Sequence, residues 1–172
     1  MSLQIRLAEP SEYDEVGDLT VTGYLADDLL PPDSPYVSDL RAAKRRAEEA
    51  ELWVAVDGGG ILGTVTFCPP DSSYRELASD GDGEFRMLTV HPDARGRGIG
   101  AALVRRCLDR AREFGQSRVV ISSAEQMRTA HRIYDRFGFE RLPELDWKPA
   151  PDVQLLAFAL ELEPPETSVS GR

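Results

Sequence analysis

The run Arg95-Gly96-Arg97-Gly98-Ile99-Gly100 decides the fold that this sequence predicts. It lies between an apolar segment with strand character, residues 84–90, and a helical pattern of apolar residues that begins near Gly98. Glycines at alternate positions let a backbone turn tightly and approach a ligand closely. The helix that follows offers unpaired N–H groups and the positive end of its dipole. The run therefore predicts a cradle for phosphate, to which the two arginines add charged donors.

Two other glycine-rich phosphate sites compete with this interpretation. Gly96, Gly98 and Ala101 also satisfy the G-x-G-x-x-A pattern of a dinucleotide fold, but that fold needs an acidic residue at the end of the next strand. The next predicted strand, residues 117–123, has no acid at its tip. A Walker loop is excluded because no Gly-Lys-Ser/Thr follows the glycines. A turn without any ligand would leave the two arginines among the glycines unexplained.

A longer pattern surrounds the glycine turn. A strand with Leu-x-Val precedes it, an amphipathic helix and a second strand follow, and the next helix ends in a Gly-Phe pair. The positions that form this pattern are Leu88, Val90, Pro92, Arg95, Gly98, Gly100, Ala130, Tyr134, Gly138 and Phe139. The sequence between about 84 and 139 resembles the GNAT superfamily of N-acetyltransferases, which bind acetyl-coenzyme A. Arg95, Gly98 and Gly100 match the fixed positions of that family's pyrophosphate signature, [Q/R]-x-x-G-x-[G/A], whereas Met127 stands where many members have a cofactor-binding asparagine.

The resemblance, together with the order of predicted elements, implies a mixed α/β (α+β) fold. We expect a central sheet of six or seven strands with helices on both faces, in which strands 84–90 and 117–123 run parallel and splay apart. The other expected strands are 3–8, 52–56, 61–67, 139–147 and 153–162, and helices are expected from Ser11 and over 38–50. We expect one domain, residues 1–163, and a disordered polar tail, residues 164–172.

The resemblance also implies a set of site residues. Those expected to bind acetyl-coenzyme A are Leu88, Thr89 and Val90 along its pantetheine arm and Arg95, Gly96, Arg97, Gly98, Ile99 and Gly100 around its pyrophosphate. Tyr134 matches the phenol that protonates the departing thiolate, although a tyrosine beside apolar neighbours also packs well in a core. Glu84 stands where many members place a carboxylate base, although it also reads as a solvated acid that closes an acidic loop. The implied reaction is direct attack of a primary amine on the thioester within a ternary complex. The alternative is a non-catalytic sensor of acyl-coenzyme A on the same fold.

Composition limits the remaining possibilities. The chain has 172 residues, a length that fits one domain. Its formal net charge of −10 disfavours nucleic acid as a partner. No apolar stretch reaches membrane length, and Cys68 and Cys107 are expected to be reduced thiols, so we expect a cytoplasmic protein. Neither histidine has metal-ligand spacing, and no metal is predicted. The sequence does not decide whether the acceptor amine is cationic or whether it belongs to a small molecule or a peptide. It also does not decide whether the chain forms a homodimer.

Overall fold

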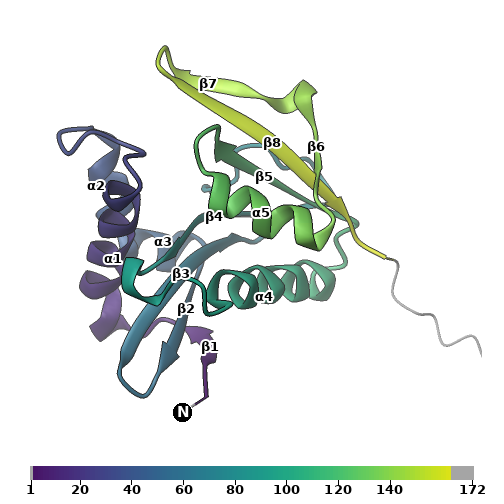
Figure 1. The fold of residues 1–172 in the computed structure, drawn as a ribbon. Coiled ribbons are helices and arrows are strands. Elements are labelled where there is room, and N and C mark those ends of the chain that lie inside the picture. The colour runs from purple at the N-terminus through teal and green to yellow at the C-terminus, as the bar shows by residue number, and fades with distance from the viewer. Residues whose placement is uncertain (1, 164–172) are drawn as a thin grey trace, which may run out of the picture.

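The computed structural model describes residues 2–163, so the expected tail at 164–172 lies outside the described residues. An eight-stranded sheet has the order β1-β2-β3-β4-β5-β8-β6, and β7 pairs with β8 (Figure 1). The strands are β1 (Gln4–Leu7), β2 (Glu51–Asp57), β3 (Gly60–Cys68), β4 (Asp82–Val90), β5 (Arg118–Ala124), β6 (Glu140–Arg141), β7 (Trp147–Ala150) and β8 (Val153–Glu161). The helices are α1 (Tyr13–Ala26), α2 (Tyr36–Arg41), α3 (Ala43–Glu49), α4 (Ile99–Glu113) and α5 (Arg128–Phe137), with short 3₁₀ turns η1 (Pro10–Glu12), η2 (Pro92–Ala94) and η3 (Pro143–Leu145).

Helices cover both faces of the sheet, as predicted. The larger hydrophobic core lies under α4 and α5, where Leu103, Cys107 and Tyr134 pack against β3, β4, β5 and β8. A second core lies on the opposite face, where Val16 of α1 and Ala43 of α3 pack on β2. Among residues 2–163, no helix combines the length and the apolar character needed to cross a bilayer.

Two elements are divided where the sequence predicted continuous ones. The predicted strand 139–147 is interrupted by η3 and becomes β6 and β7, so the sheet has eight strands instead of six or seven. The predicted helix 38–50 is interrupted at Ala42, whose ψ of 56° is not helical, and becomes α2 and α3. Pro149 lies within β7, where a proline is tolerated because this short strand pairs only with β8.

The parallel strands β4 and β5 separate along their length. They pair only from Asp82 opposite Arg118 to Glu84 opposite Val120. From there, β5 continues along β8, and β4 continues along β3. Met87 lies at φ 57° where β4 carries one more residue than β3, which is a β-bulge. The predicted splay is therefore confirmed, and among residues 2–163 the backbone of β4 beyond Glu84 has no strand partner on the β5 side.

Candidate active site

A groove of about 700 Å³ lies where β4 and β5 separate. One wall is the end of β4 with the turn that follows it, and the opposite wall is α5; the end of α1 closes one side. The predicted cofactor residues that line it are Leu88, Thr89, Val90, Arg95, Gly96, Gly98, Ile99 and Gly100. The structure thus brings together in one groove the residues predicted for the pantetheine arm and those predicted for the pyrophosphate, with the exception of Arg97.

The glycine turn has the backbone conformation that the sequence predicts. Gly96 and Gly98 lie at φ 80° and 77°, in the left-handed region where a side chain is strained. Helix α4 begins at Ile99, and no side chain caps its first turn. The N–H groups of that turn and the positive end of the helix dipole are therefore available to an anion in the groove.

Arg95 is held at the groove by two other elements. Its Nε donates to the Val90 carbonyl at 3.3 Å, and its guanidinium pairs with the Asp27 carboxylate at 2.5 Å. Asp27 follows the last residue of α1 and lines the groove itself. This pair was not predicted from the sequence, because 68 positions separate the two residues. An anion that binds Arg95 must compete with the Asp27 carboxylate.

Replacing Asp27 by asparagine is therefore expected to tighten acetyl-coenzyme A binding about 1.4- to fivefold, because a partly exposed ion pair is worth about 0.2–1 kcal/mol. Isothermal titration calorimetry measures this directly. Asp28→Asn removes the same charge from the next position, which does not line the groove, and is expected to leave affinity unchanged. Weaker binding by Asp27→Asn would instead show that Asp27 holds Arg95 in place for the ligand.

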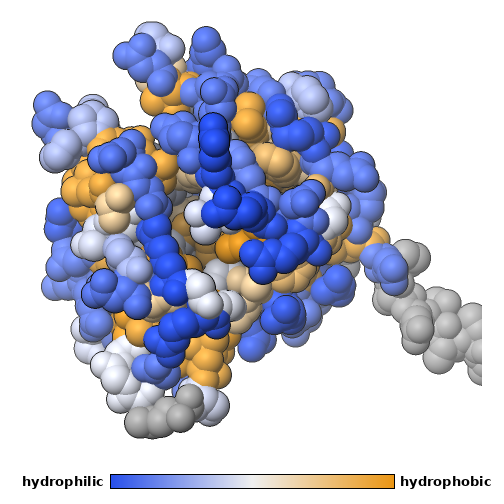
Figure 2. Space-filling view, in the orientation of Figure 1, coloured by the Kyte–Doolittle hydropathy of each residue, from blue (hydrophilic) through white to orange (hydrophobic). Residues whose placement is uncertain are grey.

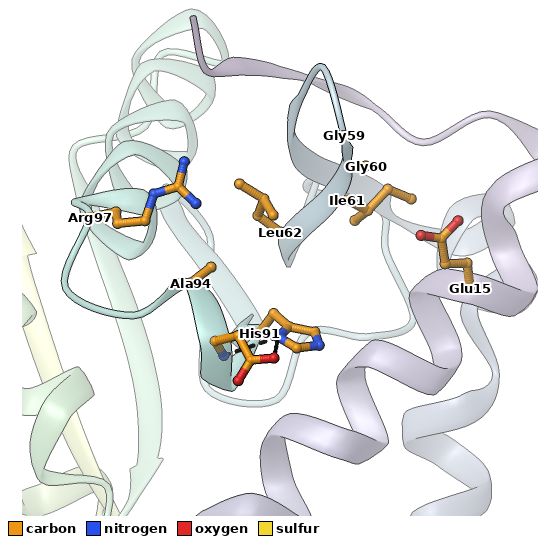
Figure 3. A pocket seen from close by; sticks show the side chains of 9 residues that line it. Glu15, Gly59, Gly60, Ile61, Leu62, His91, Ala94 and Arg97 are labelled. Carbon is orange, nitrogen blue, oxygen red and sulfur yellow. Dashed lines mark hydrogen bonds and ion pairs between the residues drawn. The ribbon is translucent and has the colours of Figure 1, made fainter. Parts of the chain in front are cut away.

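The side chain of Arg97 does not line the groove. It pairs with Asp57 of β2 at 3.0 Å and lines a separate hollow of about 440 Å³, together with Gly59, Gly60 and His91 (Figure 3). In this hollow, His91 Nδ1 accepts a hydrogen bond from the Asp93 backbone. The Arg97 guanidinium thus faces the turn between β2 and β3 and not the groove.

The ring of Tyr134 lies in the core under α5 and does not line the groove. It is 5% exposed and packs against Phe85, Phe139 and Phe158 at centroid distances of 5.5–6.0 Å. Within residues 2–163, its hydroxyl makes no hydrogen bond, and burial raises its pKa well above that of a free phenol. Tyr24 of α1 lines the groove, and burial, followed by the nearby phenols of Tyr36 and Tyr134, raises its pKa too. Both phenols are protonated at neutral pH, which is the form that donates.

Glu84 is fully buried, so its interpretation as a solvated acid is wrong. Its Oε1 accepts the backbone N–H groups of Glu76, Leu77 and Ala78 at 2.9–3.0 Å, which ties the loop before β4 to the strand. Its Oε2 is buried and has no partner among the described residues. Burial raises the pKa of this carboxyl despite the three hydrogen bonds. The arrangement leaves one carboxylate oxygen able to accept a proton.

Arg86 pairs with Glu76 at 3.2 Å. Its two terminal nitrogens donate to the Tyr74 carbonyl and the Tyr36 hydroxyl. These contacts join β4, α2 and the loop before β4.

Most of the α5 residues that line the groove were not predicted as site residues from the sequence. Met127, at the usual asparagine position, does line the groove, and its sulfur accepts a hydrogen bond from Ser123. The wall also contains Arg128, Arg132 and Arg136, whose four-residue spacing was visible in the sequence. Within the described part of the chain, no group of three or more histidine, cysteine or acidic residues is placed to hold a metal ion.

Residues 19–139 match the sequence model of the acetyltransferase (GNAT) family. The chain belongs to this family. The GNAT chain is 35% identical over 119 residues to rat N-acetyltransferase 8, covering 64% of this chain and 50% of that protein. It is 31% identical over 110 residues to zebrafish N-acetylaspartate synthetase, covering 64% of this chain and 36% of that protein. The chain therefore spans about a third to a half of the length of these relatives.

Solved structures share the GNAT fold at low sequence identity. A GNAT-family acetyltransferase from Staphylococcus aureus superposes with a TM-score of 0.74 at 14% identity, covering 94% of this chain and 100% of that one. A suspected acetyltransferase from Salmonella typhimurium, determined with its cofactor acetyl-CoA, has a TM-score of 0.68 at 20% identity, covering 99% and 100%. The predicted fold is thereby confirmed.

Proposed function

We propose that this GNAT chain transfers the acetyl group of acetyl-coenzyme A to a primary amine, by direct attack within a ternary complex. One observation carries the proposal: the strand gap that begins after Glu84 and the anion-binding turn at Arg95–Gly100 line the same groove. A long ligand with an amide-bearing arm and a diphosphate fits such a groove. Family membership and the acetyltransferase names of the relatives support the same activity.

The residues present fit acetyl-coenzyme A. The backbone of β4 beyond Glu84 offers unpaired polar groups to an extended, amide-bearing arm, as a sheet edge does to an added strand. The first turn of α4 and Arg95 offer donors to a diphosphate. When bound, acetyl-coenzyme A supplies a thioester that is already activated toward an amine, so the chain has mainly to position the reactants and move protons.

Two proton transfers fall to this chain's residues. An alkylamine with a pKa near 10.4 is mostly charged at neutral pH and must lose a proton before it attacks. Glu84 Oε2 is the proposed acceptor, through a water molecule, because its other oxygen is occupied by three N–H groups. The Tyr134 hydroxyl is the proposed donor to the departing sulfur, because burial keeps it protonated.

The proposal is tested by ligand binding followed by turnover. Acetyl-coenzyme A is expected to raise the melting temperature of the chain, and NAD is expected to leave it unchanged. Release of free thiol from acetyl-coenzyme A is then measured with a panel of amines. The panel contains aspartate, suggested by the name of the zebrafish relative, and polyamines and peptide amines, suggested by the acidic charge of the chain. Thiol release that depends on one class of amine is the expected result.

The outcomes separate the two functions that the fold permits. Stabilisation by acetyl-coenzyme A without thiol release from any amine would favour a non-catalytic sensor of acyl-coenzyme A. Stabilisation by NAD instead would overturn both functions and restore the dinucleotide interpretation of Gly96 and Gly98.

A further inference from the structure

The hollow that Arg97 lines contains charged and polar groups that the proposed function does not use. Its volume of about 440 Å³ lies in the range of small-molecule sites, about 300–1,000 Å³. It is formed by the first part of α1, the turn between β2 and β3, and residues 91–97 after β4. Ala94 lines both the hollow and the groove, so the two cavities share a wall. In Figure 2, the lower left of the surface, where the β2–β3 turn lies, mixes pale and hydrophobic residues with strongly hydrophilic ones.

Two side chains of the hollow offer hydrogen-bond donors. Arg97 Nη2 donates to Asp57 Oδ2 at 3.0 Å, and its other N–H groups make no hydrogen bond within residues 2–163. Asp57 also accepts the Gly59 N–H at 3.1 Å, so it keeps a partner if the guanidinium turns to a ligand. His91 Nδ1 accepts the Asp93 N–H at 3.0 Å, which leaves the ring hydrogen on Nε2. His91 Nε2 is therefore a second donor, and it has no partner among the described residues.

Acidic side chains also line the hollow. Glu15 of α1 lies at the opposite end of the hollow from Arg97 (Figure 3), and it makes no ion pair within residues 2–163. The side chain of Asp93 is 94% exposed, and its carboxylate approaches His91 Nδ1 only to 3.9 Å. A purely anionic ligand would meet these two carboxylates, and a purely cationic ligand would meet Arg97. A ligand with a negative group toward Arg97 and a positive group toward Glu15 meets opposite charge at both ends.

The middle of the hollow is apolar. Figure 3 shows Leu62 and Ile61 of β3 between Arg97 and Glu15. Both β3 side chains are partly exposed, so a ligand that covers them removes apolar surface from water. The hairpin side of the hollow is open, since a Cβ at Gly60 would meet no atom within 4 Å. The hollow therefore presents an apolar surface between a cationic end and an acidic end.

We propose that this hollow is a binding site for a linear amino acid whose ammonium and carboxylate groups are separated by an apolar methylene chain. Arg97 and His91 Nε2 hold the carboxylate, because charge-assisted hydrogen bonds to a carboxylate are strong. The methylene chain covers Ile61 and Leu62, and the ammonium group faces Glu15. This site is distinct from the groove, and it does not depend on the proposed function.

An NMR titration of the full chain with 6-aminohexanoate tests this site. The backbone amide signals of Gly59 and Gly60, which line the hollow, are expected to shift and to saturate. The signal of Gly23, which lines the groove and not the hollow, is expected to stay in place. Hexanoate lacks the ammonium group and hexylamine lacks the carboxylate. Each is therefore expected to bind at least about threefold more weakly than 6-aminohexanoate, as for the loss of a partly exposed ion pair.

Two variants assign the charged groups to the two ends of the ligand. Glu15→Gln is expected to weaken binding of 6-aminohexanoate at least about threefold and not to weaken binding of hexanoate. Asp14→Asn removes the same charge from the neighbouring position, which does not line the hollow, and is the matched control that is expected to keep the affinity. Arg97→Gln is expected to weaken 6-aminohexanoate and hexanoate and not to weaken hexylamine.

Four results would overturn the site. The first is the absence of any shift at Gly59 and Gly60, and the second is a shift at Gly23 alone, which would place the ligand in the groove. Equal affinity for 6-aminohexanoate, hexanoate and hexylamine would show that only the apolar surface binds. Equal weakening by Glu15→Gln and Asp14→Asn would show only a general effect of charge. All four leave the proposed function intact, because acetyl-coenzyme A takes no part in these titrations.

Discussion

Replacing Tyr134 by phenylalanine is expected to lower kcat about 100-fold, since a positioned general acid contributes at least that much. The phenylalanine ring retains the contacts with Phe85, Phe139 and Phe158, and the hydroxyl makes no hydrogen bond with the described residues. The melting temperature and the dissociation constant of acetyl-coenzyme A are therefore expected to stay near those of the unmodified protein. Steady-state kinetics, thermal denaturation and calorimetry provide the three measurements.

The matched control for this variant is Tyr24→Phe. Tyr24 is a partly buried phenol and lines the groove from α1, so it is the other group that is placed to donate a proton. Tyr24→Phe is expected to retain most of kcat. A large loss of kcat in Tyr24→Phe with little change in Tyr134→Phe would move the donor from α5 to α1. If neither variant changed kcat, proton donation by a phenol would be excluded.

Replacing Glu84 by glutamine is expected to lower kcat about 100-fold at pH 7.5, because an amide cannot accept the proton that a general base removes. The amide oxygen can still accept the N–H groups of Glu76, Leu77 and Ala78, so the loop before β4 remains attached. The acidic limb of the pH profile of kcat is expected to disappear in the variant, since that limb reports the ionisation of Glu84.

The difference in stability between Glu84→Gln and the unmodified protein is expected to depend on pH. Burial raises the pKa of Glu84 in the folded protein above its value in the unfolded chain. A group of this kind contributes its full stability below the unfolded pKa, about 4.3, and loses that contribution as the pH rises through the folded pKa. Glu84→Gln is therefore expected to have an equal or higher melting temperature than the unmodified protein at pH 7.5, and no advantage at pH 4.

Glu76→Gln is the control for the loss of a partly buried carboxylate. Glu76 also has a raised pKa because of burial, and it pairs with Arg86. This variant is expected to retain most of kcat. If Glu84→Gln left kcat unchanged, Glu84 would serve only to hold the loop before β4 in place. Another group would then have to accept the proton.

The sequence predicted the order of the elements and the phosphate turn because both depend on local properties. The apolar spacing of α4 and the short apolar runs of β2, β3 and β5 indicate secondary structure within a few residues. Gly96 and Gly98 predicted a left-handed turn because a side chain is strained in that conformation. The division of 139–147 and of 38–50 was missed, since it depends on how these segments pack on β8 and α1.

The sequence by itself determined the family and the position of the glycine turn, and the splayed strands followed from the resemblance to that family. Only the tertiary structure decided which side chains meet there: Asp27 reaches Arg95, Arg97 turns to Asp57, and the loop before β4 buries Glu84. It also placed the arginines of α5 beside the first turn of α4. Backbone conformation follows from neighbouring residues, whereas ion pairing and desolvation depend on groups that are distant in sequence and are brought together only by packing.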